Sequence, residues 1–214
     1  MRTRTIASSF VIAALFAAPA LAQSPTGEES VSLSTVPVVP TGFSLQLGGG
    51  VTGFSQKGAR VRFGTGGYWD VRAVLGTGSF LGAELAYVGS ARDANATGLA
   101  DNAALLGNGA EAALRANLPL TTGGLRVEPF VFGGVGWTYY NVANSDSNTS
   151  IIKDHANSFV IPFGAGLSLA WSHFLVDARF TYRGVFDDDL VATGGSDSQD
   201  LQNWSAGLTV GYQL

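Results

Sequence analysis

Residues 204–214 of the chain read WSAGLTVGYQL, and this stretch decides the fold. Every second side chain, beginning with Trp204 and ending with Leu214, is apolar, whereas the side chains between them are small or polar, as at Ser205 and Thr209. Successive side chains of a β-strand point to opposite faces, so the stretch predicts a strand with one apolar and one polar face. In a water-soluble protein the apolar face would lie in a core. In a membrane barrel it would face lipid, and the polar face would line the lumen.

The same alternation recurs earlier in the chain. It is found within residues 43–52, 69–75, 81–87, 110–118, 126–139, 159–169 and 176–183. With the C-terminal stretch these make eight strands, and single-chain bacterial membrane barrels have an even number. We therefore expect an all-β fold, an eight-stranded antiparallel transmembrane β-barrel with an up-and-down meander, formed by residues 42–214.

The expected connections alternate in length. Residues 76–79, 120–124 and 172–173 are short turns, whereas 90–108, 141–157 and 185–200 are longer and polar. Short periplasmic turns and long outer loops are the asymmetry expected of such barrels. Residues 58–67 fit either a loop or the start of the second strand, so the extent of that strand stays open.

The first residues predict export. Arg2 and Arg4 precede an apolar stretch over residues 6–21, which ends in the small-residue cleavage pattern Ala-Leu-Ala at residues 20–22. These are the parts of a secretory signal peptide, too short to span a membrane as a retained helix. We expect residues 1–22 to direct export through the Sec pathway, with cleavage after Ala22, and residues 23–41 to form a flexible periplasmic leader.

The composition narrows the class of protein. The chain has no cysteine, which excludes a disulfide framework and a lipid-bearing cysteine at the cleavage site. Its net charge of −4 argues against a nucleic-acid partner, which needs a basic surface. Charged residues make up 13% of the chain, about half the share usual in soluble domains. A glycine-rich chain with so few charges favours a membrane barrel over a soluble enzyme.

The aromatic residues provide an independent argument. Those on the apolar parity gather near the two expected ends of the strands, where amphipathic rings of a membrane barrel form girdles at the interfaces. The alternative is a soluble lipocalin-like barrel, in which the apolar parity would face inward and this sorting would have no cause. The expected girdle consists of Trp69, Tyr87, Trp137, Tyr139, Tyr182 and Trp204 at the loop ends, and Trp171, Phe174 and Tyr212 at the turn ends.

Two strand segments carry a resemblance to a known family. Residues 129–137 read PFVFGGVGW and residues 177–183 read DARFTYR. With the signal peptide and the eight strands they resemble the OmpA-like outer-membrane β-barrel family, the small porin-family barrels of Gram-negative bacteria. The resemblance covers residues 42–214. It implies a place in the cell outer membrane, a monomer, and contacts with outer-membrane lipid and lipopolysaccharide.

The C-terminus is similar to a further feature of that family. Gly207, Val210, Tyr212 and Leu214 match the assembly signal that the outer-membrane barrel-insertion machinery recognises, with Leu214 where Phe or Trp is usual. The resemblance thus implies this machinery as a partner. Larger relatives carry a periplasmic peptidoglycan-binding domain after the barrel, and we do not expect that activity where the sequence stops at the last strand.

The side chains that alternate with the apolar ones, and would face inward, predict a charged lumen. Buried charges are costly unless they are paired, and equal numbers of acids and bases suggest an internal ion-pair network. An eight-stranded barrel is just wide enough inside for its own side chains, so we expect a lumen largely closed by this network. A narrow channel that opens when the arginines exchange partners is the alternative. The expected network is Asp70, Glu84, Glu111, Glu128 and Asp177 with Arg72, Arg115, Arg126, Arg179 and Arg183.

No catalytic, cofactor-binding or metal-binding residue is predicted. His155, beside Asp154 and within possible reach of the acids at 187–189, is the one candidate for an enzyme at the outer rim, because His173 lies in an expected periplasmic turn. A solvated loop histidine is the simpler interpretation, and the acidic residues likewise match no calcium-loop spacing. We expect a structural or surface-interaction role. The alternatives are a narrow low-conductance porin and, with least support, a lipid- or peptide-hydrolysing enzyme.

Overall fold

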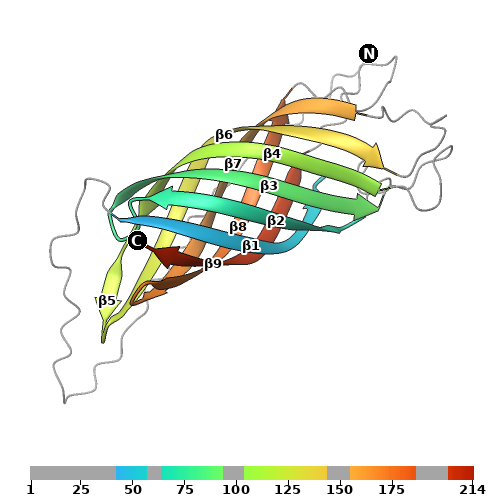
Figure 1. Cartoon of the computed structure of the whole chain (residues 1–214). Coiled ribbons are helices and arrows are strands. Elements are labelled where there is room, and N and C mark those ends of the chain that lie inside the picture. The colour runs from blue at the N-terminus through green and yellow to red at the C-terminus, as the bar shows by residue number, and fades with distance from the viewer. Residues whose placement is uncertain (1–41, 57–63, 94–103, 144–154, 187–201) are drawn as a thin grey trace, which may run out of the picture. The chain divides into compact units, whose positions relative to one another are not determined.

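The computed structural model describes residues 42–56, 64–93, 104–143, 155–186 and 202–214. The regular elements in these ranges are all β-strands, drawn in Figure 1. No helix in this part of the chain is long and apolar enough to cross a membrane. The strands are β1 Phe43–Phe54, β2 Gly66–Leu75, β3 Leu81–Asp93, β4 Ala104–Asn117, β5 Leu120–Thr122, β6 Leu125–Ala143, β7 His155–Trp171, β8 Phe174–Phe186 and β9 Asn203–Gln213.

The strands form one closed antiparallel sheet. The short β5 aside, each strand pairs with the next one along the chain, so that β4 pairs with β6, and the pairing of β1 with β9 closes the barrel. The short β5 pairs with β6 alone and continues the line of β4 after a break at Leu118 and Pro119. The Leu118 amide donates to the Pro129 carbonyl (2.9 Å), which keeps the interrupted strand against β6. The wall thus has eight strands in an up-and-down meander, and the predicted fold is confirmed.

The predicted boundaries of several connections were wrong. Residues 120–124 are not one turn, because β5 pairs with the start of β6 and only Gly123 and Gly124 form the turn. Both have positive φ, +55° and +82°, as a two-residue hairpin turn requires. The strands also extend into the expected long loops: β3 continues to Asp93 and β4 begins at Ala104. The second strand, whose extent stayed open, begins at Gly66.

The two ends of the barrel differ. At one end, called the turn end, lie the connections at residues 76–80, 123–124 and 172–173, together with Gly42 and Leu214. At the other, called the loop end, β1, β3, β6 and β8 finish and β2, β4, β7 and β9 begin. The expected segregation of short turns from the other connections is therefore present.

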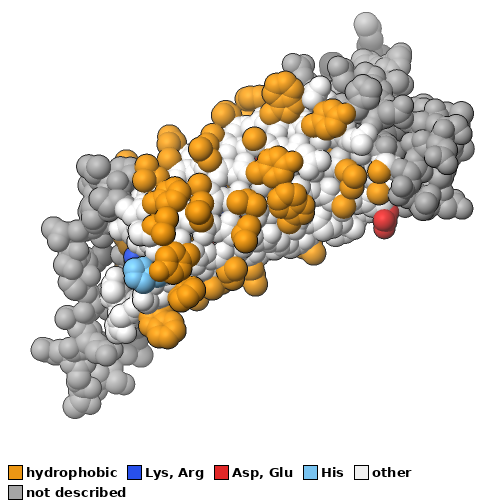
Figure 2. Space-filling model, in the orientation of Figure 1, with side chains coloured by type: hydrophobic (Ala, Val, Ile, Leu, Met, Phe, Trp, Pro, Cys, Tyr) orange, Lys and Arg blue, Asp and Glu red, His pale blue; other side chains and the backbone are white. Residues whose placement is uncertain are grey.

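The burial pattern is the reverse of that in a soluble protein. Leu114 on the outer wall is 75% exposed, whereas its neighbour Arg115 is 2% exposed. Figure 2 shows hydrophobic side chains spread over one face of the wall, with the few visible charged and histidine side chains at its two ends. A lipocalin-like barrel would bury the apolar parity, so that alternative does not fit.

Candidate functional site: the barrel interior

All ten residues of the expected lumen network lie inside the barrel. Nine of them are buried, and the side chain of Arg126 is 22% exposed near the turn end. They come from β2, β3, β4, β6 and β8. Strand pleating explains their common direction, because each lies on the inward parity of its strand. The ion pairs divide the interior into three levels.

The middle level centres on Glu84 of β3. Arg179 of β8 donates to both of its carboxylate oxygens, at 3.0 and 2.9 Å, and Arg72 of β2 donates to Oε1 at 2.9 Å. Arg72 also pairs with Asp70 at 2.7 Å. One carboxylate thus joins arginines from two different sides of the barrel. Such bidentate, charge-assisted pairs are the strong class of protein hydrogen bond.

The level nearer the turn end centres on Arg115 of β4. Its Nη2 lies 3.3 Å from Glu128 Oε1, its Nη1 lies 3.2 Å from Asp177 Oδ2, and its Nε donates to Asn117 Oδ1. Arg126 lies 3.3 Å from the other oxygen of Glu128. This level therefore connects β4, β6 and β8 across the interior, with Arg115 fully buried.

Two phenylalanines fill the space between these levels. The Arg115 guanidinium lies 3.6 Å from the centre of the Phe130 ring, and Arg179 lies 4.3 Å from that of Phe132. Phe130 faces Gly166 across the β6–β7 pair, and Phe132 faces Gly164. Glycine opposite each ring leaves the room that the ring occupies. Cations stacked on rings add about 0.5–2 kcal/mol each where water is excluded.

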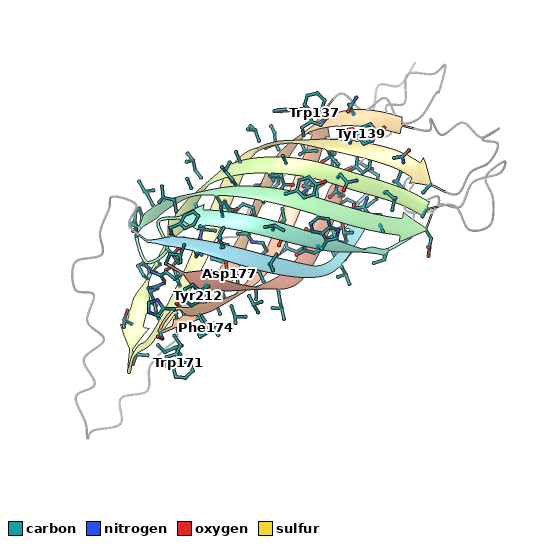
Figure 3. All side chains as sticks on the ribbon, viewed as in Figure 1. Trp137, Tyr139, Trp171, Phe174, Asp177 and Tyr212 are labelled. Carbon is teal, nitrogen blue, oxygen red and sulfur yellow. The ribbon has the colours of Figure 1, made fainter. Side chains whose placement is uncertain are left out.

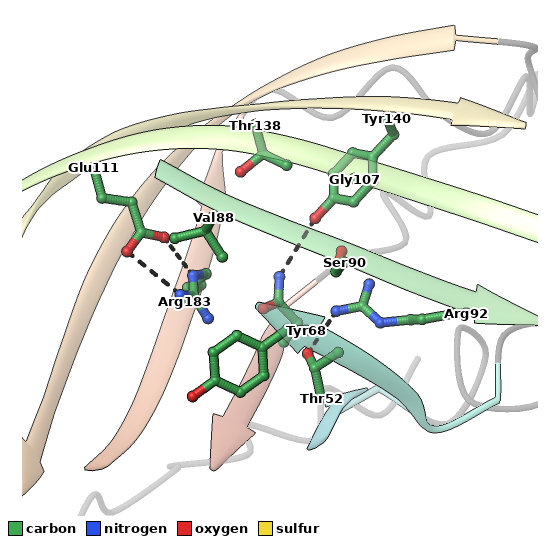
Figure 4. A pocket seen from close by; sticks show the side chains of 11 residues that line it. Thr52, Tyr68, Val88, Ser90, Arg92, Gly107, Glu111, Thr138, Tyr140 and Arg183 are labelled. Atoms are coloured by element: carbon green, nitrogen blue, oxygen red, sulfur yellow. Dashed lines mark hydrogen bonds and ion pairs between the residues drawn. The ribbon is translucent and has the colours of Figure 1, made fainter. Parts of the chain in front are cut away.

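The level nearer the loop end contains residues that the sequence did not single out. Arg183 pairs with Glu111 and donates to Ser205 at 2.8 Å. Beside this expected pair lie Arg92, which was assigned to a loop, and Tyr140, both buried. Figure 4 shows them around a small cavity with the Arg183–Glu111 pair on its other side. Arg92 could have been found by extending the alternation of β3 two residues past Ser90.

The turn at residues 76–79 closes the turn end from inside. Thr77 is 4% exposed and Ser79 is fully buried. Asn117 donates to the carbonyls of Gly76 (3.2 Å) and Ser79 (2.9 Å), while the Gly78 amide donates to Glu128 at 3.0 Å. The sequence predicted this turn but not that it folds into the mouth of the barrel. The turn thereby covers the turn end of the described interior.

The expected girdle residues lie on the outer wall near both ends. Figure 3 shows Trp137 and Tyr139 toward the loop end and Trp171, Phe174 and Tyr212 at the turn end. Trp171 is 71% exposed and Trp137 is 60% exposed. Trp69 and Tyr87 contact one another with ring centres 5.5 Å apart, whereas Tyr182 and Trp204 are half-buried by neighbouring side chains.

The C-terminal signal residues lie on β9 and just beyond it. The Leu214 amide donates to the Phe43 carbonyl (2.8 Å), so the end of the chain is held by β1. Val210 and Tyr212 are exposed on the outer wall. The fold itself requires glycine at position 207, because a Cβ there would collide with the Gly49 carbonyl and the Tyr68 hydroxyl.

His155 was the one candidate for an enzyme at the outer rim. The side chain of His155 and the acidic residues at 154 and 187–189 lie outside the described part of the chain. His173 lies at the turn end, where its ring stacks on Tyr212 and its Nδ1 is 3.1 Å from the Gln213 carbonyl. Among the described residues no group of three or more His, Cys, Asp or Glu could hold a metal ion.

Comparisons with known proteins bear on the fold. No family model matches the chain, and no curated protein matches it in sequence. The crystal structure of Neisserial surface protein A is similar, with a TM-score of 0.54 at 12% identity over 82% of this chain and 99% of that one. The N-terminal β-barrel domain of Pseudomonas aeruginosa OprF gives a TM-score of 0.47 at 18% identity over 82% of this chain and 100% of that one. At 12% identity, the likeness to Neisserial surface protein A shows the fold alone.

Proposed function

We propose that this chain is an outer-membrane protein whose lumen is closed by its own side chains and which acts through its wall and its outer loops. The observation that carries the proposal is the reversed burial pattern, in which leucines cover the wall and paired charges fill the interior. Exposed apolar area of this extent on a soluble monomer would be an association surface, whereas in a bilayer it is the lipid-facing wall. Ion pairs join β3 to β8 and β4 to β8 across the described interior, where a solute would have to pass.

The membrane orientation follows from the two ends. The turn end faces the periplasm and the loop end the outside, because bacterial barrels place their short turns on the periplasmic side. The exposed aromatic residues at the two ends then lie at the two interfaces, where rings with a polar edge are favourable. The lipid partners of this proposal are the outer-membrane phospholipids and lipopolysaccharide, and the insertion machinery would engage the C-terminal strand β9.

The test of the closed lumen is electrical. The mature chain, beginning at Gln23, is refolded and its single-channel conductance is measured in a planar bilayer beside the double variant Arg115→Ala, Arg179→Ala. These substitutions remove the two cations stacked on Phe130 and Phe132. A silent parent and a conducting variant support the proposal. Steady ion-selective steps from the parent would overturn it and leave the narrow porin as the better account.

A further inference from the structure

The interior contains a small polar cavity toward the loop end. It has a volume of about 20 Å³ and lies between Arg92 of β3, Tyr140 of β6 and the Arg183–Glu111 pair. Figure 4 shows the Arg92 guanidinium beside this space, with Thr52 and Ser90 near it. Roughly 10–15 Å³ of such space accommodates one water molecule, so the cavity has room for one particle of about that size.

Arg92 is the one arginine of the described interior without a carboxylate partner. The five buried acids all pair with the other five arginines, whereas no described carboxylate lies within ion-pair distance of Arg92. Its Nη2 donates to Thr52 at 2.7 Å and its Cζ lies 4.3 Å from the centre of the Phe54 ring. Its Nε and Nη1 have no partner in the described part of the chain, and the residue is only 4% exposed.

A buried guanidinium without a counter-charge is strongly disfavoured. Water in the cavity would satisfy the two vacant N–H groups but would leave the positive charge unbalanced. An anion does both. Arg183 and Glu111 on the far side balance each other, so the unbalanced charge at the cavity is that of Arg92. The lining also offers a hydroxyl donor, because the Tyr140 oxygen accepts from Asn203 at 3.5 Å and its own hydrogen can turn toward the cavity.

We propose that this cavity is a binding site for a single halide-sized anion, chloride under ordinary conditions, held by the vacant N–H groups of Arg92. A volume of about 20 Å³ suits an anion of one heavy atom better than phosphate or a carboxylate. The bound anion brings the charge of the interior to neutrality and fixes the guanidinium against Phe54. The site is independent of whether the lumen conducts.

The test is the anion dependence of stability in detergent micelles. Thermal unfolding of the refolded protein is compared in sodium chloride, sodium bromide and sodium gluconate at equal ionic strength, gluconate being too large to enter. We expect both halides to raise the unfolding temperature in a saturable way, as a ligand of the native state does. Equal unfolding temperatures in the three salts would overturn the proposal and mean that only water fills the cavity or that another group of the chain balances Arg92.

Two variants separate this site from general salt effects. Arg92→Gln removes the proposed anchor and should lose the halide dependence. Arg126→Gln removes a lumen arginine at the opposite end and should keep it. Persistence of the dependence in Arg92→Gln would contradict the proposal. Should that variant not refold, crystals of the parent grown in bromide decide: an anomalous peak beside Arg92 supports the site, and ordinary water density without such a peak overturns it.

Discussion

At the scale of single residues, the close packing of Phe130 inside the barrel depends on Gly166. Gly166 has Phe130 directly opposite it, and a Cβ at Gly166 would collide with that ring and lie 2.5 Å from the Ala178 carbonyl oxygen. We expect Gly166→Ala to lower the free energy of unfolding by about 1–3 kcal/mol, the usual cost of overpacking. Urea unfolding in lipid vesicles measures the change.

Gly133→Ala is the matched control for this substitution. Gly133 lies on the neighbouring strand β6 but on the outer wall, and the nearest atom to a Cβ there is 4.0 Å away. The free energy of unfolding of the Gly133→Ala variant should therefore stay within about 0.5 kcal/mol of that of the parent, as for surface substitutions in general. Equal losses at both positions would mean that strand conformation, and not the packing of Phe130, sets the cost.

The bridging carboxylate Glu84 gives the second prediction. Glu84→Gln leaves Arg72 and Arg179 buried with one fewer counter-charge between them. Removing one partner of a buried pair costs about 3–5 kcal/mol, and we expect a loss in that range by equilibrium unfolding. Asp93→Asn, an exposed acid at the end of the same strand, should change stability little. A neutral result for Glu84→Gln would show that the middle level of the network contributes no net stability.

Sequence parity identifies which charges face inward, but not which charges meet. Alternation alone puts Glu84 and Arg179 on inward faces, since the period of a strand is two residues. Their contact depends on the tilt and stagger with which β3 and β8 face one another across the closed barrel, and these are properties of the whole sheet. Arg92 and Tyr140 were missed for a different reason, because both lie in strand ends that were assigned partly or wholly to loops.

At the scale of elements, the turn at residues 76–79 closes the turn end of the barrel from inside, and its position depends on Asn117. Asn117→Ala removes both hydrogen bonds to the turn carbonyls, at a cost of about 0.5–1.5 kcal/mol for each, while the Gly76 carbonyl still accepts from the Ser79 amide (3.1 Å). We expect the turn to open more often. Because the chain has no cysteine, Thr77→Cys can be labelled specifically with a maleimide. Labelling should be slow in the parent background and faster with Asn117→Ala.

The control for labelling is Thr121→Cys on the exposed β5 strand. The side chain of residue 121 is exposed and lies outside the turn at residues 76–79, so its labelling should be fast in both backgrounds. If Asn117→Ala speeds labelling equally at both positions, the substitution loosens the barrel as a whole, and the specific role of Asn117 in holding the turn is wrong.

The number and order of the strands were predictable, but their ends were not. Alternation of apolar and small or polar side chains identified the lipid-facing part of every strand. Beyond that part, as at Ser90 of β3 or Asn108 of β4, the strands continue with polar side chains on either face, and the sequence signal becomes that of a loop. The pairing of β4 with β6 past the break at Pro119 was likewise hidden, because β5 continues the line of β4 and the hairpin turn lies only at Gly123 and Gly124.

At the scale of the whole molecule, the charge of the interior fixes the selectivity of any opened form. The variant Arg115→Ala, Arg179→Ala keeps the five lumen acids but only Arg72, Arg92, Arg126 and Arg183 among the arginines. Its current should therefore be cation-selective, since charged linings favour the opposite ion. The reversal potential in a potassium chloride gradient measures this.

The opposite substitution should reverse the sign of this selectivity. The variant Glu84→Gln, Glu111→Gln leaves the arginines in excess, and any current through it should favour chloride. The same sign of reversal potential in both variants would mean that the ions pass by another path, such as a defect at the edge of the barrel.

Three of the ion pairs join residues that are far apart along the chain, and this has a consequence for how fast the barrel assembles. Arg179 and Glu84 are separated by 95 residues, Arg183 and Glu111 by 72, and Arg115 and Asp177 by 62. No hairpin of neighbouring strands can form these pairs, so a partly assembled sheet carries unpaired charges that lipid disfavours. Loop-closure entropy opposes such distant contacts until β1 meets β9. We therefore expect the closing of the ring to be the slow step of folding, with charge neutralisation and closure in one cooperative event.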